Sequence, residues 1–419
     1  MKKHFLFLAS AICLLASCHK DEYQQAGGKL ERAVLVYVAG DNNLTGGSTD
    51  YFKDDLRQMM EGTKNLGTGS KLVLFVDISS SERPYFLQVE KGDTTRLMTM
   101  ATELKSSDAE TLYDAMKYFT DRFEAKSYGL VLWGHADGWI VRGSASTAAA
   151  KAPRRAYGVD YRGERTYMDI PDMAKALARL PKLDFIFADC CSFLCVENVY
   201  ELRRYADHII GSPAEIPGEG APYQTVVPAM FSQQDDFPRQ IVDAYYAQTS
   251  HGYKVPLAAV KTSELDDLAA ATAATLQSFA ADIEPDGQGC RYPNVDDLIF
   301  YYDHTQFDMQ DFMLRYASAE QYAEWKRTFD KAVAYSTFAP VWMANHVYYS
   351  PYSDNEFADF TVTEERQGVL GMFLPQTDAD QAWWNRFYQI NLNKSMSQMN
   401  SEIKQMQWYQ AAGLSAMGW

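Results

Sequence analysis

Short apolar runs alternate with segments of helical periodicity through the first half of the chain. The apolar runs are residues 33–39, 71–77, 128–134, 184–188 and 208–211. Between them, apolar side chains recur every three or four positions, which is the spacing of an amphipathic helix, in residues 51–60, 111–123, 168–180 and 196–205. Strands that alternate with helices in this way form mostly parallel sheets covered on both faces. The pattern therefore predicts an α/β fold with a mostly parallel central sheet.

The second half of the chain has a different pattern. From about residue 226 onward helical periodicity dominates, most clearly in residues 264–283 and 321–337. Two apolar runs, 255–260 and 369–374, interrupt it. We expect these two runs to add edge strands to the sheet.

The N-terminus has the composition of an export signal. Two lysines precede an apolar run at residues 5–17, which is too short to cross a membrane as a helix and is followed by Cys18. The Leu-Ala-Ser-Cys segment that ends at Cys18 resembles a bacterial lipobox, in which the cysteine becomes the lipidated first residue. We expect residues 1–17 to be removed, Cys18 to anchor the exported protein to the bacterial cell envelope, and residues 18–30 to form a tether. An ordinary secretory signal with an incidental Cys18 is the alternative.

Charge excludes one large class of partner. The chain has 39 Lys and Arg residues against 55 Asp and Glu residues, a formal net charge of −16. Because such a field repels phosphate backbones, we expect no nucleic-acid partner. Hydrophobic residues make up 47% of the chain, which is enough for a substantial core and excludes a disordered protein.

Reactive side chains follow the predicted strands. In a parallel sheet the ligand-binding crevice lies beyond the carboxyl ends of the strands. His135 follows the third predicted strand, and Asp189, Cys190 and Cys191 follow the fourth. A cysteine nucleophile needs its thiolate and a neighbouring group that moves protons, so the pattern predicts a cysteine–histidine pair at this edge. We interpret Asp41-Asn42-Asn43, after the first strand, as a turn.

The cysteine cluster lacks the spacing of a structural zinc site. Cys190, Cys191 and Cys195 have neither the two-residue gap nor the paired second half that such sites use, and Cys290 lies far downstream. We therefore expect no metal and no disulfide framework. Packing is the expected role of Cys190 and Cys195.

Several motifs together resemble those of the clostripain-like cysteine peptidases, a family of the caspase-like clan. They are Gly-Asp-Asn-Asn-Leu at 40–44, Trp-Gly-His-Ala-Asp-Gly-Trp at 133–139, Asp-Cys-Cys at 189–191, a segment from Glu197 to the Tyr-Glu-Leu of 200–202, and Pro-Gly-Glu-Gly at 217–220. Members of the family carry similar motifs in this order. The order of histidine before cysteine, with one helix between them, also matches that of caspases.

The resemblance covers residues 31–225 and implies a caspase-like α/β/α sandwich as the catalytic core. Residues 226–419 then form a C-terminal region that is largely helical, with strands that extend the sheet. The resemblance implies a cysteine endopeptidase that acts on proteins or peptides without a cofactor. Neither the resemblance nor the sequence indicates whether calcium is required.

The resemblance also implies the roles of individual residues. Cys191 matches the family nucleophile and His135 its partner, and by the caspase pattern the backbone N–H groups of Ala136 and Cys191 form the oxyanion hole. The family cleaves after arginine or lysine, and Asp189 and Glu219 match the acids of the pocket that binds this side chain. Glu219 is one methylene longer than the usual aspartate, so the preference between arginine and lysine stays open.

A basic loop separates the histidine from the cysteine. Residues 141–167 begin with small side chains and then carry Lys151, Arg154 and Arg155. An enzyme that cuts after basic residues would hold its own substrate here, and exposed loops are readily cut. Because the family is processed in this linker, the resemblance implies cleavage after Lys151, with Arg154 or Arg155 as the next choices. A solvated loop that is never cut is the alternative.

Two functional classes are open at this point. One is a lipid-anchored cysteine endopeptidase that cleaves after arginine or lysine. The other is a catalytically silent surface lipoprotein that binds peptide or glycan with the same fold. We favour the peptidase because His135, Cys191, Asp189 and Glu219 are all present, whereas a silent relative has no chemical need to keep them.

Overall fold

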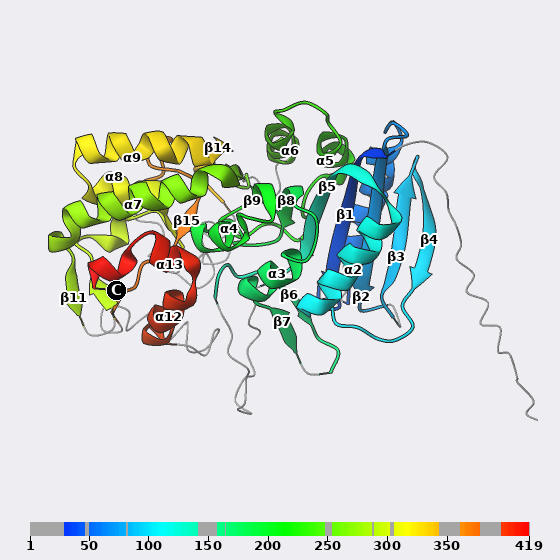
Figure 1. Ribbon diagram of the computed structural model, residues 1–419, viewed down its shortest axis with the longest axis horizontal. Coiled ribbons are helices and arrows are strands. Elements are labelled where there is room, and N and C mark those ends of the chain that lie inside the picture. Colours follow the sequence, from blue (N-terminus) through cyan, green and yellow to red (C-terminus); the bar gives the residue numbers. More distant parts are fainter. Residues whose placement is uncertain are drawn as a thin grey trace, which may run out of the picture.

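The centre of the molecule is a large, mostly parallel sheet (Figure 1). The computed structural model describes residues 29–46, 50–80, 83–140, 157–163, 165–247, 254–286, 289–301, 306–342, 361–377 and 395–418. Within these residues nine strands run in the order β14-β10-β9-β8-β5-β1-β2-β3-β4. The strands are β1 (Leu30–Gly40), β2 (Ser70–Ile78), β3 (Tyr85–Glu90), β4 (Asp93–Thr99), β5 (Ala125–Gly134), β8 (Leu183–Asp189), β9 (Ala206–Gly211), β10 (Ala258–Lys261) and β14 (Val333–Ser336). The five central strands are parallel and the outer ones antiparallel, which confirms the predicted α/β class.

Side chains of β1 alternate between two apolar cores, one on each face of the sheet. Leu35 and Tyr37 belong to one core, and Val36 and Val38 to the other. Both faces are covered, so both sets of side chains are apolar. This explains why β1 is a continuous apolar run in the sequence.

Six helices in the described residues pack on these two faces. α2 (Ala109–Arg122), α3 (Ile170–Leu177) and α4 (Val196–Leu202) bury their apolar side chains on the face of Leu35, while α1 (Tyr51–Thr63), α5 (Tyr223–Met230) and α6 (Phe237–Tyr246) do so on the opposite face. Asp50 and Asp108 begin α1 and α2 by accepting backbone N–H bonds, as N-cap residues do. The alternation of strand and helix brings the carboxyl ends of the parallel strands to one edge of the sheet.

Some strands were not predicted from the sequence. β3 and β4 form an antiparallel hairpin beside β2. The sequence of β4, Asp-Thr-Thr-Arg-Leu-Met-Thr, is mostly polar and its side chains are largely exposed, so it carries no signal of a buried strand. β6 (Tyr157–Asp160) and β7 (Thr166–Met168) pair with each other, and Tyr157 also forms a bridge to Ala136 just beyond β5.

Beyond β9 the described chain is mainly helical. After α5 and α6, its helices are α7 (Leu265–Phe279), α8 (Met309–Tyr316), α9 (Ala319–Ala332), α12 (Met396–Glu402) and α13 (Gln407–Ala411). Its short strands outside the central sheet are β11 (Glu284–Asp286), β12 (Gly289–Arg291), β13 (Phe307–Asp308) and β15 (Gly371–Met372). The run 255–260 supplies β10, which extends the sheet as expected. The expectation for 369–374 is wrong, because β15 pairs with β13 in a separate sheet. The N–H group of Gly371 bonds to the Leu194 carbonyl, and this run therefore pairs with the loop before α4.

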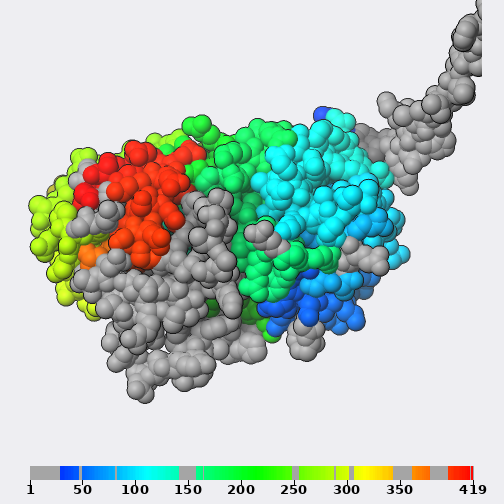
Figure 2. All heavy atoms as spheres, turned by 90° about the horizontal axis from the view of Figure 1, so that it is seen from below, coloured from blue at the N-terminus to red at the C-terminus, as the bar shows by residue number. Residues whose placement is uncertain are grey.

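The C-terminal segment packs on the core through α4. The backbone and side-chain N–H groups of Gln407 each donate to the Glu201 carboxylate at 2.6 Å. In both views this segment, coloured red, lies at the opposite end of the molecule from the blue and cyan strands (Figure 2). No helix in the described ranges is long and apolar enough to cross a membrane.

Candidate active site

A cavity of about 240 Å³ opens at the carboxyl ends of the parallel strands. Loops that follow β1, β5, β8 and β9 form its walls, together with the start of α1. Its lining residues are Asn43, Leu44, Tyr51, Trp133, Gly134, His135, Asp189, Cys191, Glu215, Ile216, Pro217, Gly218 and Gly220. The structure thus brings three of the sequence-predicted side chains, His135, Cys191 and Asp189, to one cavity.

Cys191 is the cysteine that faces this cavity. Its Sγ lies 3.5 Å from the backbone nitrogen of Ile216, whose N–H group can donate to the sulfur. Cys190 and Cys195 are fully buried, and burial raises the pKa of each thiol well above its usual range. Since the thiolate is the reactive form, burial disfavours Cys190 and Cys195 as nucleophiles. All four cysteines that the structure describes are free thiols.

The ring of His135 is held by a side chain that the sequence analysis did not select. His135 Nε2 lies 3.0 Å from Oδ1 of Asn43, and the Tyr161 hydroxyl donates to the same Oδ1 at 3.1 Å. Because this oxygen is an acceptor, Nε2 carries the hydrogen and Nδ1 is the nitrogen able to take a proton. The local signal was present in the Asn-Asn pair, but we interpreted the pair as a turn.

Asp189 is buried at the wall of the cavity. Its side chain is 3% exposed, and its Oδ2 accepts hydrogen bonds from the Tyr223 hydroxyl at 2.7 Å and the Ala221 N–H group at 3.2 Å. Burial raises the pKa of this carboxyl to about 6, and these two hydrogen bonds limit the rise. The carboxylate is therefore mostly ionised at neutral pH and presents a negative charge to the cavity.

The second predicted acid lies at the margin of the cavity. Gly218 and Gly220 line the cavity, whereas Glu219 between them is exposed and is not a lining residue. Glu215 from the same loop does line it. Nothing in the sequence sets Glu215 apart from other acids in loops. Only the folded structure places it at the cavity.

The two predicted oxyanion-hole donors lie close to the reactive pair in the chain. Ala136 is buried directly after His135, and the Gly158 N–H group donates to the carbonyl of His135 at 2.8 Å. This bridge to β6 uses the amide of Gly158, not that of Ala136. Ser192, directly after Cys191, has φ +55°, an uncommon conformation for a residue other than glycine. The chain therefore turns sharply at the nucleophile, and the Ser192 N–H group bonds to Ala214.

The C-terminal region supports the loop that carries Cys191. The Gln306 side chain donates to the Ser192 carbonyl at 2.8 Å, and the Phe373 N–H group donates to Glu197 at 2.9 Å. Glu197 is fully buried, and burial raises its pKa to about 7. Residues far from Cys191 in the sequence thus fix the nucleophile loop in place.

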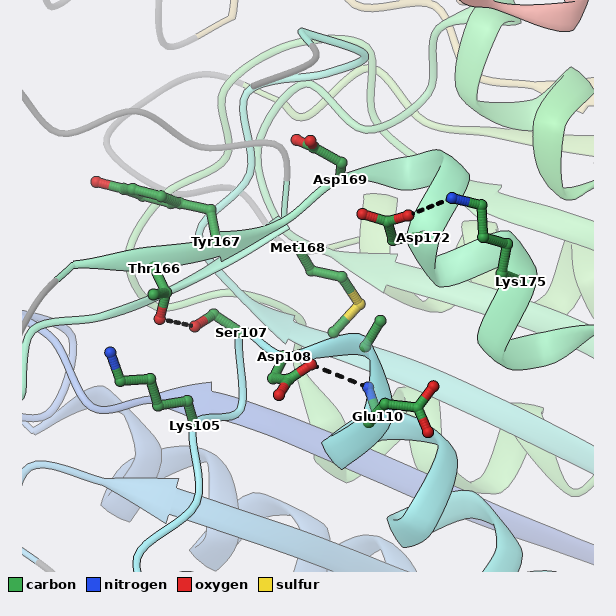
Figure 3. Close-up of a pocket in the computed structure, with 11 residues that line it drawn as sticks. Lys105, Ser107, Asp108, Glu110, Thr166, Tyr167, Met168, Asp169, Asp172 and Lys175 are labelled. Carbon is green, nitrogen blue, oxygen red and sulfur yellow. Dashed lines mark hydrogen bonds and ion pairs between the residues drawn. The ribbon is translucent and has the colours of Figure 1, made fainter. Parts of the chain in front are cut away.

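A larger cavity, about 420 Å³, lies elsewhere on the molecule between the start of α2 and the segment of β7 and α3 (Figure 3). Asp172 and Lys175 pair at its wall, and the Ser107 and Thr166 hydroxyls are 2.7 Å apart. Its lining contains neither cysteine nor histidine, so it lacks the thiol and the imidazole that line the first cavity.

The remaining predicted sites lie outside the described residues. They are Cys18 and the linker residues Lys151, Arg154 and Arg155. Within the described part of the chain, no group of three or more His, Cys, Asp or Glu side chains is arranged to hold a metal ion.

Comparison with known proteins gives a consistent result. Residues 36–409 match the family model described as the clostripain family, peptidase C11. A secreted C11 cysteine protease from Bacteroides thetaiotaomicron, solved with an irreversible peptide inhibitor, is 26% identical with a TM-score of 0.71, and the match covers 92% of this chain and 99% of that one. An inactive zymogen C11 protease from Parabacteroides distasonis is 28% identical with a TM-score of 0.70, over 92% and 99% of the two chains. No curated protein sequence matches significantly.

Proposed function

The chain belongs to the clostripain family and is a cysteine-type peptidase, and from this premise we propose that it is an endopeptidase that cleaves after arginine or lysine. One observation carries the proposal. The thiol of Cys191, the ring of His135 and the buried carboxylate of Asp189 line a single cavity. A nucleophile, a base and a site for a cationic side chain are therefore available to one bound peptide.

The proposed reaction passes through an acyl-enzyme. Cys191 Sγ attacks the carbonyl carbon of the scissile bond while His135 takes the thiol proton. The N–H groups of Ala136 and Cys191 stabilise the oxyanion, and the peptide C–N bond breaks as His135 returns the proton to the leaving amine. Water, deprotonated by His135, then attacks the thioester and releases the new carboxyl end.

The proposed specificity rests on charge. Asp189 holds an ionised carboxylate in a largely desolvated position, where it can pair with a guanidinium or an ammonium group. We assign Glu219 a lesser part from the margin of the cavity, because solvent screens an exposed charge.

We further propose that the enzyme cuts its own linker after Lys151, with Arg154 or Arg155 as second choices. The described residues on both sides of this linker, Ile140 and Tyr157, are buried. A cut between them would leave Ile140 in one fragment and Tyr157 in the other, each buried in the core. The relative from Parabacteroides distasonis is described as an inactive zymogen, which is consistent with activation by processing in such proteins.

We propose export and lipid attachment through Cys18, on the strength of the N-terminal sequence. Metabolic labelling with a fatty acid tests this, and Cys18→Ala should abolish the label and move the protein from the membrane to the soluble fraction. Label retained by that variant would place the lipid elsewhere or remove it from the proposal.

Turnover of three reporter peptides tests the proposed activity. The peptides differ only in the residue before the reporter, which is arginine, lysine or aspartate. We expect hydrolysis of the first two and none of the third, and we expect a peptide with an arginyl electrophile to label the wild type but not Cys191→Ala. Absence of both turnover and labelling would favour the catalytically silent lipoprotein.

A further inference from the structure

A second buried carboxyl lies behind the wall of the active-site cavity. Asp55 is one helical turn after Tyr51 on α1 and is 1% exposed. The indole N–H group of Trp133 donates to Asp55 Oδ2 at 2.7 Å. Because Tyr51 and Trp133 both line the cavity, the Asp55 side chain is held directly next to the cavity lining.

Two carboxyl oxygens in this place have no hydrogen-bond partner among the described residues. They are Oδ1 of Asp55 and Oδ1 of Asp189, and both atoms are inaccessible to solvent. The Tyr245 hydroxyl, which neighbours both carboxyls, also makes no hydrogen bond of standard geometry in the described structure. Buried polar atoms are nearly always hydrogen-bonded, so the two Oδ1 atoms have room for a further donor, even though the Tyr245 hydroxyl lies close enough to lower the pKa of Asp189.

The charge of Asp189 acts on Asp55. Burial first, and then the charge of Asp189, raise the pKa of Asp55 to about 9. Asp54 and Glu219 add to the rise, and the buried phenols of Tyr223 and Tyr245 respond to both carboxyls. The groups packed around Asp55 are therefore acidic, and the environment is suited to a cation with several N–H donors.

A purely structural role would not explain this arrangement. The Trp133 indole uses one oxygen of Asp55, and a serine or an asparagine could accept that bond without placing a second ionisable carboxyl next to Asp189. Two adjacent carboxyls with free oxygens cost stability unless a ligand pairs with them. The site with this destabilising pair of carboxyls lies beside Cys191 and His135.

We propose that Asp55 is a specificity-determining residue, and that its carboxylate joins Asp189 in binding the cationic end of the substrate side chain that precedes the cleaved bond. The proposal rests on the proposed cleavage after arginine or lysine and adds a residue to it. Neither local sequence nor the family motifs quoted above select Asp55, because it lies within α1. When the cation enters, Asp55 ionises and its proton leaves to solvent, so that two carboxylates face one cation.

Paired arginine and citrulline substrates test this role. Citrulline has the shape of arginine without the charge, so the ratio of kcat/KM for the two peptides measures charge recognition. We expect Asp55→Asn to lower this ratio about tenfold or more, chiefly through KM. The rate of alkylation of Cys191 by iodoacetamide should stay at the wild-type value, because Asp55 does not act on the thiol.

Asp54→Asn is the matched control. It removes the same charge from the neighbouring position, where the Asp54 side chain is 62% exposed and pairs with Arg57. We expect its arginine-to-citrulline ratio to remain within about twofold of wild type. If folded Asp55→Asn keeps the wild-type ratio, or if Asp54→Asn lowers it equally, the role of Asp55 is overturned. A wild-type enzyme that does not distinguish arginine from citrulline instead overturns the proposed specificity itself.

A second measurement does not depend on the folding of Asp55→Asn. Benzamidine is titrated calorimetrically into Cys191→Ala at pH 7.5 in two buffers with different heats of ionisation. The difference gives the number of protons released, and we expect close to one for each benzamidine bound because Asp55 must ionise. Binding without proton release overturns the proposal.

Discussion

Asn43 and His135 face each other at the active-site cavity, with Asn43 Oδ1 3.0 Å from His135 Nε2. The side chain comes from the loop after β1 and the ring from the loop after β5, so two adjacent parallel strands fix the distance. An asparagine in this position sets the orientation of the ring and the nitrogen that carries its hydrogen. It is a positioning residue, because it acts through His135.

The first prediction concerns this contact. Asn43→Ala should lower kcat about tenfold, because the imidazolium loses one hydrogen bond when it carries the thiol proton. Asn43→Asp should restore activity and move the rising limb of the pH–rate profile to higher pH, since a carboxylate favours the charged ring. Tyr161→Phe removes the other donor to the same oxygen and should have a smaller effect. An unchanged profile in all three variants would mean that Asn43 only shapes its loop.

The second prediction separates the adjacent cysteines. Cys191→Ala should abolish hydrolysis, and Cys190→Ala should retain most of it, because Cys191 lines the cavity and Cys190 is buried in the core. Removing the Cys190 sulfur leaves a small cavity, so a modest loss of thermal stability accompanies retained activity. His135→Ala should also inactivate without preventing folding. Equal inactivation by both cysteine variants, with folding intact, would contradict the assignment.

The third prediction compares the two acids of the pocket. Asp189→Asn should lower kcat/KM for arginyl and lysyl peptides by about tenfold or more, because a buried charge–charge pair is lost. The family resemblance assigns Glu219 to the same pocket as Asp189, but its exposure predicts a decrease of no more than about fivefold for Glu219→Gln. Kinetics at low and high salt provide the check, since only the effect of Glu219 should weaken as salt rises. A larger effect for Glu219→Gln would place its side chain in the occupied pocket.

The fourth prediction concerns the linker. Wild-type protein should give two fragments by intact-mass measurement, with the first ending at Lys151, and Cys191→Ala should remain whole. In Lys151→Ala the cut should move to Arg154 or Arg155. Both fragments should stay together in native conditions, because β5 and β8 on either side of the linker are paired neighbours. A whole wild-type protein with full activity, or a cut in purified Cys191→Ala, rules out self-processing.

The fifth prediction concerns pH and a pair of buried acids away from the cavity. Burial and the neighbouring Asp160 raise the pKa of Asp77 to about 8. Because this pKa is raised above its unfolded value, the folded state holds a proton that the unfolded state releases, and stability falls as pH rises from about 4 to 8. Asp77→Asn mimics the protonated form and can still accept the Ser106 N–H bond. We expect its denaturation midpoint to exceed that of the parent at pH 8.5 and to match it at pH 4.5.

This comparison is made in the Cys191→Ala background, so that self-digestion does not affect the denaturation curves. Asp93→Asn, on the exposed strand β4, is the control for loss of one negative charge. If Asp77→Asn and its parent lose stability in parallel between pH 4.5 and 8.5, the buried pair is not the source of the pH dependence.

The strands and helices of the core were predictable because their buried positions give the sequence a periodic pattern of apolar residues. β1 and β2 are apolar at most of their buried positions, and α1 and α2 repeat at helical spacing. β4 has no apolar alternation in its sequence because it is an exposed edge strand. The run 369–374 misled us because its residues are buried by contacts to the loop before α4, and apolar composition does not distinguish such contacts from strand pairing.

The meeting of His135 and Cys191 at one cavity was also predictable, but the contacts that support these two residues were not. His135 and Cys191 follow the ends of β5 and β8, at the edge where parallel sheets bind their ligands. The contacts of Asn43 with His135 and of Gln306 with Ser192 join segments that are remote in sequence. A local sequence pattern does not encode contacts between remote segments, so an asparagine that contacts the histidine looks the same as one in a turn.

Once the linker is cut, the pairing of β5 with β8 becomes a contact between two separate polypeptides. His135 then belongs to one polypeptide and Cys191 to the other, with the join running through the middle of the sheet. A single chain that unfolds can return by itself, whereas two chains must first find each other, and recovery then depends on concentration. For a dilute enzyme, one unfolding event would be final. The proposed cut would therefore also limit the lifetime of the peptidase.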